Sequence, residues 1–218
     1  MKIHILTPFY RRYLSKTLVH YLEPMGVEWY PICAPGEDML IEKPWIHKVN
    51  VEKLVNKQNA WKKINDFVDM HEIDENDYYG IMCDDNMYEP GFFDIIRQQN
   101  AKIIMFSMYR GDRVPVELPD VPHPASTLII NGPGAVRPGN IDIMQYIMKG
   151  DIFKTHRFDI YDHAYSDGHY AVHFRDEHLD EIKFIPDLFA LFNYFQPGRY
   201  TRPELFLKPT WKMPEIIE

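Results

Sequence analysis

The chain has 218 residues, of which 45% are hydrophobic and 26% charged, and its formal net charge is −8. This length and balance suit one globular domain with a full hydrophobic core. The negative charge argues against a protein that binds nucleic acid by neutralising phosphates over a broad surface. No apolar stretch approaches the roughly 20 residues that a membrane-spanning helix needs.

Two further features bear on the cellular setting. The opening run MKIHILTPFY is too short for the apolar core of a signal peptide. The two cysteines, Cys33 and Cys83, do not stand in a C-x-x-C spacing. We therefore expect reduced thiols and a cytoplasmic protein without a membrane span.

Strand-like apolar runs alternate with helical patterns along the first half of the chain. In chain order, the sequence predicts a strand at 2–7, a helix within 11–26, strands at 27–33 and 45–50, a helix at about 53–71, and a strand at 78–83. The Pro-Gly at 35–36 marks a turn between the second and third of these strands.

The second half continues the alternation with longer connections. It predicts a helix opening at Pro90, strands at 102–107 and 126–130, helical patterns at 141–149 and about 167–176, and a last strand at 181–186. Proline- and glycine-rich loops are expected at 109–125 and 131–140, with a proline-dotted tail from 197. Repeated β-α-β units predict an α/β fold, with a mainly parallel central sheet flanked by helices.

Two adjacent carboxylates end the strand in YYGIMCDDNMY, residues 78–88. Asp84 and Asp85 repel each other, so a cation, a basic partner or water must compensate their charges. In open α/β sheets, ligands bind beyond the carboxyl ends of strands, and Thr7–Tyr10 occupy an equivalent position after the first strand. A strand-end Asp-Asp suits Mg²⁺ or Mn²⁺ bound together with phosphates. An exposed acidic turn that starts the next helix is the alternative.

Three short motifs, in order, resemble the GT-A glycosyltransferases, and most closely the glucuronyltransferase family that builds proteoglycan linkers. They are TPFYRR (7–12), KQNAW (57–61) and CDDNMY (83–88). GNIDIMQYIMKGDIF (139–153), YSDGHY (165–170) and IPDLFALFNYFQPGR (185–199) are similar to the broader family-2 glycosyltransferases. The resemblance implies a single GT-A, Rossmann-like domain over 1–218. Its nucleotide-sugar half would be 1–107, its acceptor and catalytic half 108–196, and its tail 197–218.

The resemblance also implies roles for the residues of the donor site. Thr7 and Pro8 shape the turn after the first strand, and Tyr10 stacks on the nucleobase. The other donor-site residues are basic or acidic: Arg11 and Lys57 approach the diphosphate, Asp85 is the direct metal ligand, and Asp84 contacts the donor or lies behind Asp85. Cys83 stands where the family has an aspartate, which puts the usual ribose contact in doubt.

For the second half, the resemblance suggests a general base and a further metal ligand. Asp167, in the Asp-Gly that opens a helix, is the expected base that deprotonates the acceptor; the alternative is that it caps the helix, a role that Ser166 could share. His169 and His173 share one helical face, and His173 is the expected metal ligand, although a structural histidine is the alternative. Asp142 and Gln145 are candidates for contacts to donor or acceptor hydroxyls; the alternative is that they stand at a solvated helix start.

The predicted function is metal-dependent, inverting transfer of a sugar from a nucleotide-diphosphate donor to a hydroxyl of a glycan acceptor. A UDP-sugar is the expected donor, and Mn²⁺ or Mg²⁺ the expected cofactor. One alternative is a sugar-phosphate nucleotidyltransferase, although the turn at 8–12 lacks the glycine-rich phosphate loop that such enzymes need. The other is a non-catalytic domain that binds nucleotide-sugar or carbohydrate.

Overall fold

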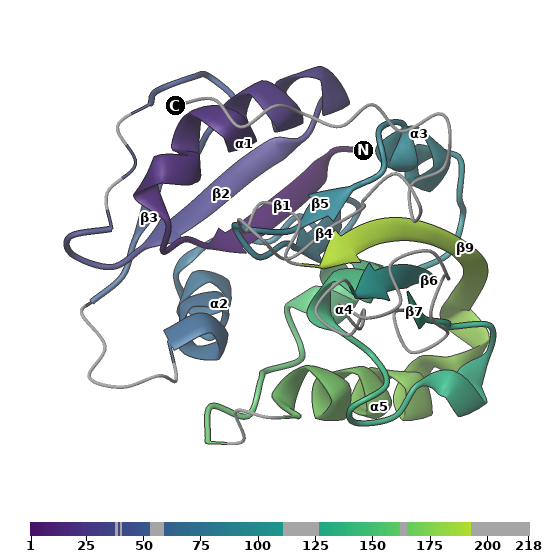
Figure 1. The fold of residues 1–218 in the computed structure, drawn as a ribbon. Helices are drawn as coiled ribbons and strands as arrows, with labels where there is room; N and C mark the ends of the chain where they lie inside the picture. The colour runs from purple at the N-terminus through teal and green to yellow at the C-terminus, as the bar shows by residue number, and fades with distance from the viewer. Residues whose placement is uncertain (38, 40, 53–58, 111–126, 162–164, 193–218) are drawn as a thin grey trace, which may run out of the picture.

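The computed structural model describes residues 1–218 except 38, 40, 53–58, 111–126, 162–164 and 193–218. Its described strands form one sheet (Figure 1). The strands are β1 (Ile3–Pro8), β2 (Glu28–Cys33), β3 (Val49–Asn50), β4 (Tyr78–Ile81), β5 (Met87–Tyr88), β6 (Ile103–Arg110), β7 (Thr127–Leu128), β8 (Tyr146–Lys149) and β9 (Ile182–Phe192).

The sheet is mainly parallel, as the sequence predicts. Its order is β3-β2-β1-β4-β8-β6-β9-β5, with β7 paired to β6. The strand pairings make β1, β2, β3, β4, β6 and β9 run in one direction, whereas β5, β7 and β8 run in the other. The carboxyl ends of the first group therefore meet at one edge, together with the amino end of β8.

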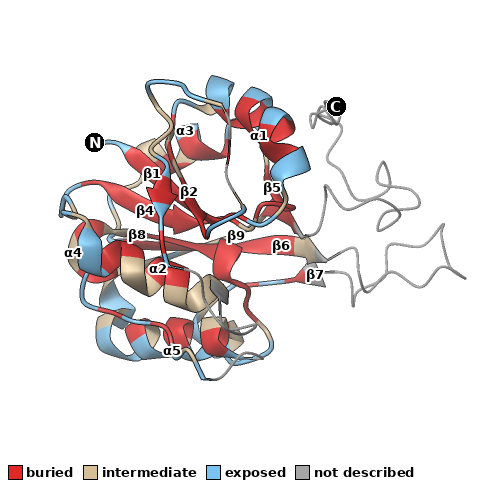
Figure 2. Cartoon of the chain, turned by 90° about the vertical axis from the view of Figure 1, so that its left-hand side faces the viewer, coloured by how far each residue is buried: buried red, intermediate tan, exposed pale blue. Residues whose placement is uncertain are grey.

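Helices cover both faces of this sheet. They are α1 (Ser15–Leu22), α2 (Asn59–Met70), α3 (Phe92–Arg97), α4 (Gly150–Phe153) and α5 (Ser166–His178). Figures 1 and 2 place α1 and α3 on one side of the sheet, and α2, α4 and α5 on the other. The strands between these helices are largely buried (Figure 2). This confirms the predicted α/β class.

Chain order and element type agree with the sequence prediction at most positions, but the predicted helix at 141–149 is wrong. Residues Ile143–Gln145 form a single 3-10 turn, and the following residues form β8, which pairs with β4 and β6. The run Tyr146–Met148 is apolar because both faces of this central strand are buried, and a short run of this kind does not distinguish helix from strand.

Part of the predicted α2 helix, residues 53–58, lies outside the described residues, as do most of the loop predicted at 109–125 and the whole tail from 197. In the described parts of the chain, every helix is too short or too polar to cross a bilayer.

Gly150 is the position where the fold leaves least room for a side chain. A Cβ at Gly150 would lie 2.1 Å from the backbone oxygen of Asp74. That oxygen belongs to the main chain and cannot rotate away. We expect Gly150→Ala to lower the free energy of unfolding by about 1–3 kcal/mol, measured by urea denaturation.

Gly132→Ala is the matched control for this substitution. A Cβ at Gly132 meets nothing within 4 Å, and its φ of 170° is extended backbone that alanine adopts without strain. We expect this variant to keep or slightly raise the wild-type stability. Equal stability of the two variants would contradict the packing of α4 against the Asp74 backbone.

Candidate active site at the carboxyl edge of the sheet

The segments after β1 and β4 meet at the carboxyl edge of the sheet because those two strands are parallel neighbours. The amide of Met82 donates to the Leu6 carbonyl at 2.9 Å, which continues the pairing beyond the end of β4. The sequence-predicted residues Tyr10, Arg11, Asp84 and Asp85 are thereby brought together, as expected from their strand-end positions.

Asp84 connects the two segments through both of its carboxylate oxygens. Its Oδ2 accepts hydrogen bonds from the backbone amides of Tyr10 and Arg11, each at 2.7 Å. Its Oδ1 accepts from the Arg11 guanidinium. The side chain is fully buried, and this burial raises the pKa of Asp84, although Arg11 and the two amides act in the opposite direction. Asp84 is therefore a positioning residue for the turn at 9–11.

Asp85 shares the same guanidinium. Nη2 of Arg11 lies 3.0 Å from Oδ2 of Asp85, so the arginine bridges both carboxylates. The Asp85 side chain is buried, whereas that of Arg11 is 31% exposed. Arg11, from the turn that follows β1, is thus a basic partner that compensates the charge repulsion between Asp84 and Asp85.

Tyr10 lies over a buried lysine from α2. Lys63 Nζ is 3.8 Å from the centroid of the Tyr10 ring, a cation–π contact. The same ammonium donates to the Phe9 carbonyl at 2.9 Å and to Oε2 of Glu37 at 2.6 Å. The Lys63 side chain is fully buried, and burial lowers its pKa. Lys63 thus supports one face of a ring that is 37% exposed.

Negative charge exceeds positive charge at this edge. The pKa of the Cys83 thiol is raised well above its usual value by burial and by the charges of Asp142, Asp85 and Asp84, which puts these groups in one neighbourhood. Among the described residues that take part in these contacts, Asp84, Asp85, Asp142 and Glu37 carry negative charge, and Arg11 and Lys63 carry positive charge. The carboxylates of Asp84, Asp85 and Asp142 are buried.

Asp142 and Gln145 form a capping box before β8. Oδ1 of Asp142 accepts from the Met144 amide at 3.1 Å, and Oε1 of Gln145 accepts from the Asp142 amide at 2.9 Å. The Gln145 side-chain amide also donates to the Phe106 and Leu128 carbonyls at 3.0 Å each. Gln145 is fully buried and holds β6 and β7 together, a structural role that sequence reasoning missed.

Thr7 is also bonded within the protein: its Oγ1 accepts from the Trp29 indole at 2.9 Å. Pro8 is the last residue of β1, and the Phe9 amide donates to the Ile32 carbonyl at 3.0 Å. These contacts fix the direction in which the chain leaves β1. Lys57 lies outside the described residues, so the described basic residue of α2 at this edge is Lys63.

Asp167 lies in the first turn of α5, beside the amino end of β8. The Tyr146 hydroxyl donates to the Asp167 carbonyl at 3.4 Å, and Oδ1 of Asp167 accepts from the Gly168 amide at 2.8 Å. Burial raises the pKa of Tyr146 well above its usual value, and the charges of Asp167 and Asp142 contribute in the same direction. Asp167 and Asp142 therefore act on one tyrosine, although they lie on different segments.

Close packing explains the glycine of the Asp-Gly pair at the start of α5. A Cβ on Gly168 would lie 2.6 Å from Cα of Pro138, so glycine allows α5 to approach the 137–139 turn. Ser166 does not cap the helix; its hydroxyl donates to the Asp159 carbonyl at 2.7 Å. The glycine of this motif is thus explained without reference to substrate.

His173 lies further along α5, with different neighbours. Its Nε2 is 3.3 Å from Oε1 of Glu177, and its ring contacts that of His156 at 5.2 Å between centroids. His169 is exposed, one turn before His173. His173 thus contacts a cluster of histidine and glutamate, whereas Asp85 contacts Arg11.

Sequence reasoning missed Lys63 and Glu37. Lys63 is separated from Phe9 by 54 residues and from Glu37 by 26, so local pattern contains no sign of the pair. The one available signal is the position of Lys63 between Ala60 and Ile64 on a helix whose apolar face is buried, where a lysine needs a partner.

The chain matches no family model and no curated protein. Solved structures with a similar fold include the 2-C-methyl-D-erythritol 4-phosphate cytidylyltransferase of Francisella tularensis, at 10% identity over 71% of this chain and 77% of that chain, with a TM-score of 0.40. A 4-diphosphocytidyl-2C-methyl-D-erythritol synthase matches at 13% identity over 94% of this chain and 95% of that chain, with a TM-score of 0.48.

A putative glucose-1-phosphate thymidylyltransferase from Bacillus anthracis, solved in complex with a sucrose, matches at 9% identity over 87% of each chain, with a TM-score of 0.47. Two of the three are nucleotidyltransferases by name, and the other is named a synthase. At these identities and TM-scores the matches do not indicate which reaction this chain catalyses.

The raised pKa of Asp84 gives a pH-dependent prediction. A carboxyl group whose pKa is higher in the folded state than in the unfolded state binds its proton more tightly when folded. Its contribution to stability is therefore greatest in the protonated form, and it falls as pH rises from the unfolded value of 3.8 through the folded pKa. Wild type should thus lose stability relative to Asp84→Asn as pH increases over this window.

Urea denaturation of both proteins at a series of pH values measures this difference. Asparagine keeps an oxygen for the backbone amides of Tyr10 and Arg11 but loses the oxygen that accepts from the Arg11 guanidinium. Because asparagine does not titrate, the change of the stability difference with pH, and not its size at one pH, reports the titration of Asp84. If wild type instead gained stability over the variant with rising pH, Arg11 would outweigh burial and the pKa of Asp84 would be lowered.

Proposed function

We propose that this edge of the sheet binds a nucleotide-diphosphate sugar together with a divalent cation, and that the chain transfers the sugar to a hydroxyl of a glycan acceptor. The observation that carries the proposal is the pair of buried carboxylates, Asp84 and Asp85, that share one partly exposed guanidinium at the carboxyl ends of parallel strands. Such a site is stabilised by added positive charge.

The donor set fits Mg²⁺ or Mn²⁺. Both ions prefer carboxylate oxygen, and Mg²⁺ commonly uses one or two carboxylates plus substrate phosphates. Asp84 uses both oxygens on the turn at 9–11, so Asp85 is the member of the pair proposed to hold the ion. When bound, the cation would neutralise charge on the departing nucleotide diphosphate.

The remaining roles follow from the contacts of each side chain. Tyr10, with Lys63 against one face, is proposed to stack its ring on the nucleobase. Arg11, held over the carboxylates, is proposed to contact the diphosphate. Thr7, Pro8 and Asp84 fix the turn that presents Tyr10 and Arg11.

Asp167 is proposed to take the proton from the acceptor hydroxyl. Inversion at the anomeric carbon needs a carboxylate base on the acceptor side. Asp167 is partly exposed in the first turn of α5, where its Oδ1 accepts from the Gly168 amide. Asp142 is proposed to orient a substrate hydroxyl from the segment before β8.

Nucleotidyl transfer to a sugar phosphate is the alternative reaction, and two of the solved structures above are named as nucleotidyltransferases. Such enzymes cradle a triphosphate with backbone amides of a loop after the first strand. Here the amides of Tyr10 and Arg11 already donate to Asp84. This contact favours glycosyl transfer.

Asp85→Asn tests the cation site. We expect wild type to show a rise in melting temperature with one class of nucleotide, such as UDP, in the presence of Mn²⁺ or Mg²⁺, and no rise in EDTA. The rise should disappear in Asp85→Asn, because the variant removes the charge that holds the ion. Differential scanning fluorimetry across UDP, GDP, CDP and dTDP measures it.

Asp94→Asn is the matched control, since Asp94 is an exposed aspartate that pairs with Arg97 on α3. It should respond like wild type. A wild-type protein that responds to no nucleotide, with or without metal, would overturn the donor site. Product analysis separates the reactions: sugar transfer releases nucleoside diphosphate, whereas nucleotidyl transfer consumes a triphosphate and releases pyrophosphate.

Asp167→Asn tests the base. Asparagine keeps an oxygen for the Gly168 amide but cannot accept a proton, so we expect kcat to fall about 10²- to 10⁴-fold while donor affinity stays the same. Steady-state kinetics with the donor found above measure both. A variant with wild-type kcat would leave Asp167 as a helix-start residue only.

A further inference from the structure

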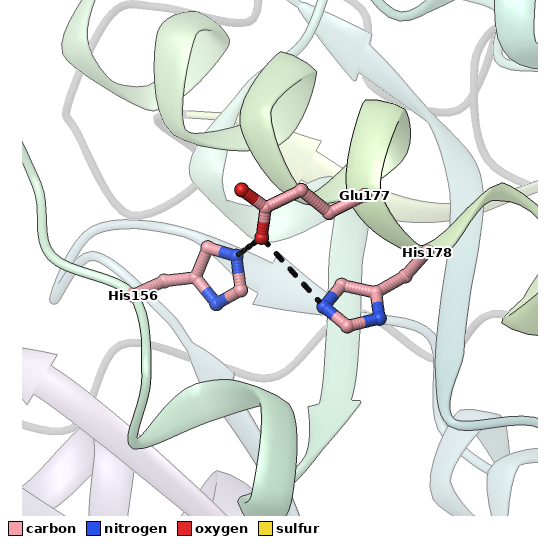
Figure 3. A group of neighbouring side chains, drawn as sticks. All are labelled: His156, Glu177 and His178. Atoms are coloured by element: carbon pink, nitrogen blue, oxygen red, sulfur yellow. Dashed lines mark ion pairs between the residues drawn. The ribbon is translucent and has the colours of Figure 1, made fainter.

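A second cluster of ligating side chains lies at the other end of α5. His156, Glu177 and His178 offer ligand atoms that all lie within 4.8 Å of one another. Glu177 and His178 come from the last turn of α5, and His156 from the segment after α4 (Figure 3). Both imidazole rings face the Glu177 carboxylate in this view.

His156 is held with one nitrogen directed at the carboxylate. Its Nδ1 lies 3.0 Å from the Ile152 carbonyl, which can only accept, and 3.0 Å from Oγ1 of Thr155, so Nδ1 carries a proton and Nε2 is the nitrogen directed at Glu177. Nε2 lies 3.3 Å from Oε2 of Glu177 but makes no hydrogen bond there, and the residue is only 5% exposed. A buried ring nitrogen that faces a carboxylate without a hydrogen bond to it is placed to share a bound cation with that carboxylate.

His178 shows the same arrangement on the other side. Its Nδ1 is 2.8 Å from Oε2 of Glu181, and its Nε2 is 4.0 Å from Oε2 of Glu177. A carboxylate that accepts from one ring nitrogen fixes the tautomer and leaves the other nitrogen to bind metal, which is the usual outer-shell arrangement of zinc-bound histidine. Glu181 is itself held by Lys102 at 2.8 Å.

We propose that His156, Glu177 and His178 bind a Zn²⁺ ion that joins the end of α5 to the segment after α4. Two imidazoles and one carboxylate are a ligand set that zinc accepts in tetrahedral sites, with a fourth position left for water. Imidazole nitrogen does not suit Mg²⁺, so this site differs in chemistry from the oxygen ligands at the edge of the sheet.

The two sites are also separate in space. Asp167 and Glu177 are ten residues apart on one helix, which corresponds to about 15 Å along its axis. The proposal therefore stands whether or not the strand-end site binds a nucleotide.

Isothermal titration of the metal-free full chain with ZnCl₂ tests the proposal. We expect one saturable site and a rise in melting temperature once free zinc exceeds Kd. Glu177→Ala and His178→Gln should each weaken zinc binding about tenfold or more. Both residues are partly exposed, so these variants are expected to fold, and circular dichroism checks that they do.

His20→Gln is the matched control, because His20 is an exposed histidine on α1. It should bind zinc like wild type, and Co²⁺ in wild type should give the visible spectrum of a tetrahedral site. Zinc binding that is absent from wild type, or equally strong in all variants, would overturn the proposal. Asp85→Asn should keep zinc binding, which distinguishes this site from the one at the sheet edge.

Discussion

The carboxylate of Asp84 is the contact on which the arrangement of the sheet edge depends. It accepts two backbone amides and one guanidinium from the turn after β1, although it stands at the end of β4, 74 residues from Tyr10. Burial of that charge is costly, as its raised pKa indicates. A fold that needed stability alone would gain from a neutral residue there, so the charge is better explained by what it positions: an exposed aromatic ring and an arginine at a strand end.

The two aspartates have different roles: Asp84 has a structural role, and Asp85 is proposed to bind the ligand. Asp84 is bonded to the turn through both oxygens, and Asp85 meets the outer nitrogen of the same arginine. Neighbouring residues of an extended chain point in opposite directions, so one guanidinium can reach both only because the chain turns after β4. The Asn86 amide donates to the Cys83 carbonyl at 3.1 Å and closes that turn. A cation at Asp85 would add charge next to Arg11, which a bound diphosphate would offset.

Local sequence pattern predicted the α/β class, the main strands and α5, because apolar periodicity reports which residues are buried. It failed at β8, where burial on both faces removes the periodicity, and at Gln145, whose amide partners lie 39 and 17 residues away. The pattern also predicted that Asp84, Asp85, Tyr10 and Arg11 lie at one edge of the sheet, because the ends of apolar strands can be recognised in the sequence. It missed Lys63, Glu37 and His156, whose partners come from distant segments and leave no local pattern.

The neighbours of His173 could not be predicted from the sequence for the same reason. Its spacing on α5 is visible in the sequence, but the element that the helix end packs against is not. In the structure, the neighbours of His173 are Glu177 and His156. Hard divalent ions prefer oxygen, and borderline ions accept imidazole. The sheet edge and the carboxyl end of α5 therefore suit different metals. We expect carboxylates and phosphates to hold the cation at the sheet edge, with His173 beside the nitrogen-rich cluster.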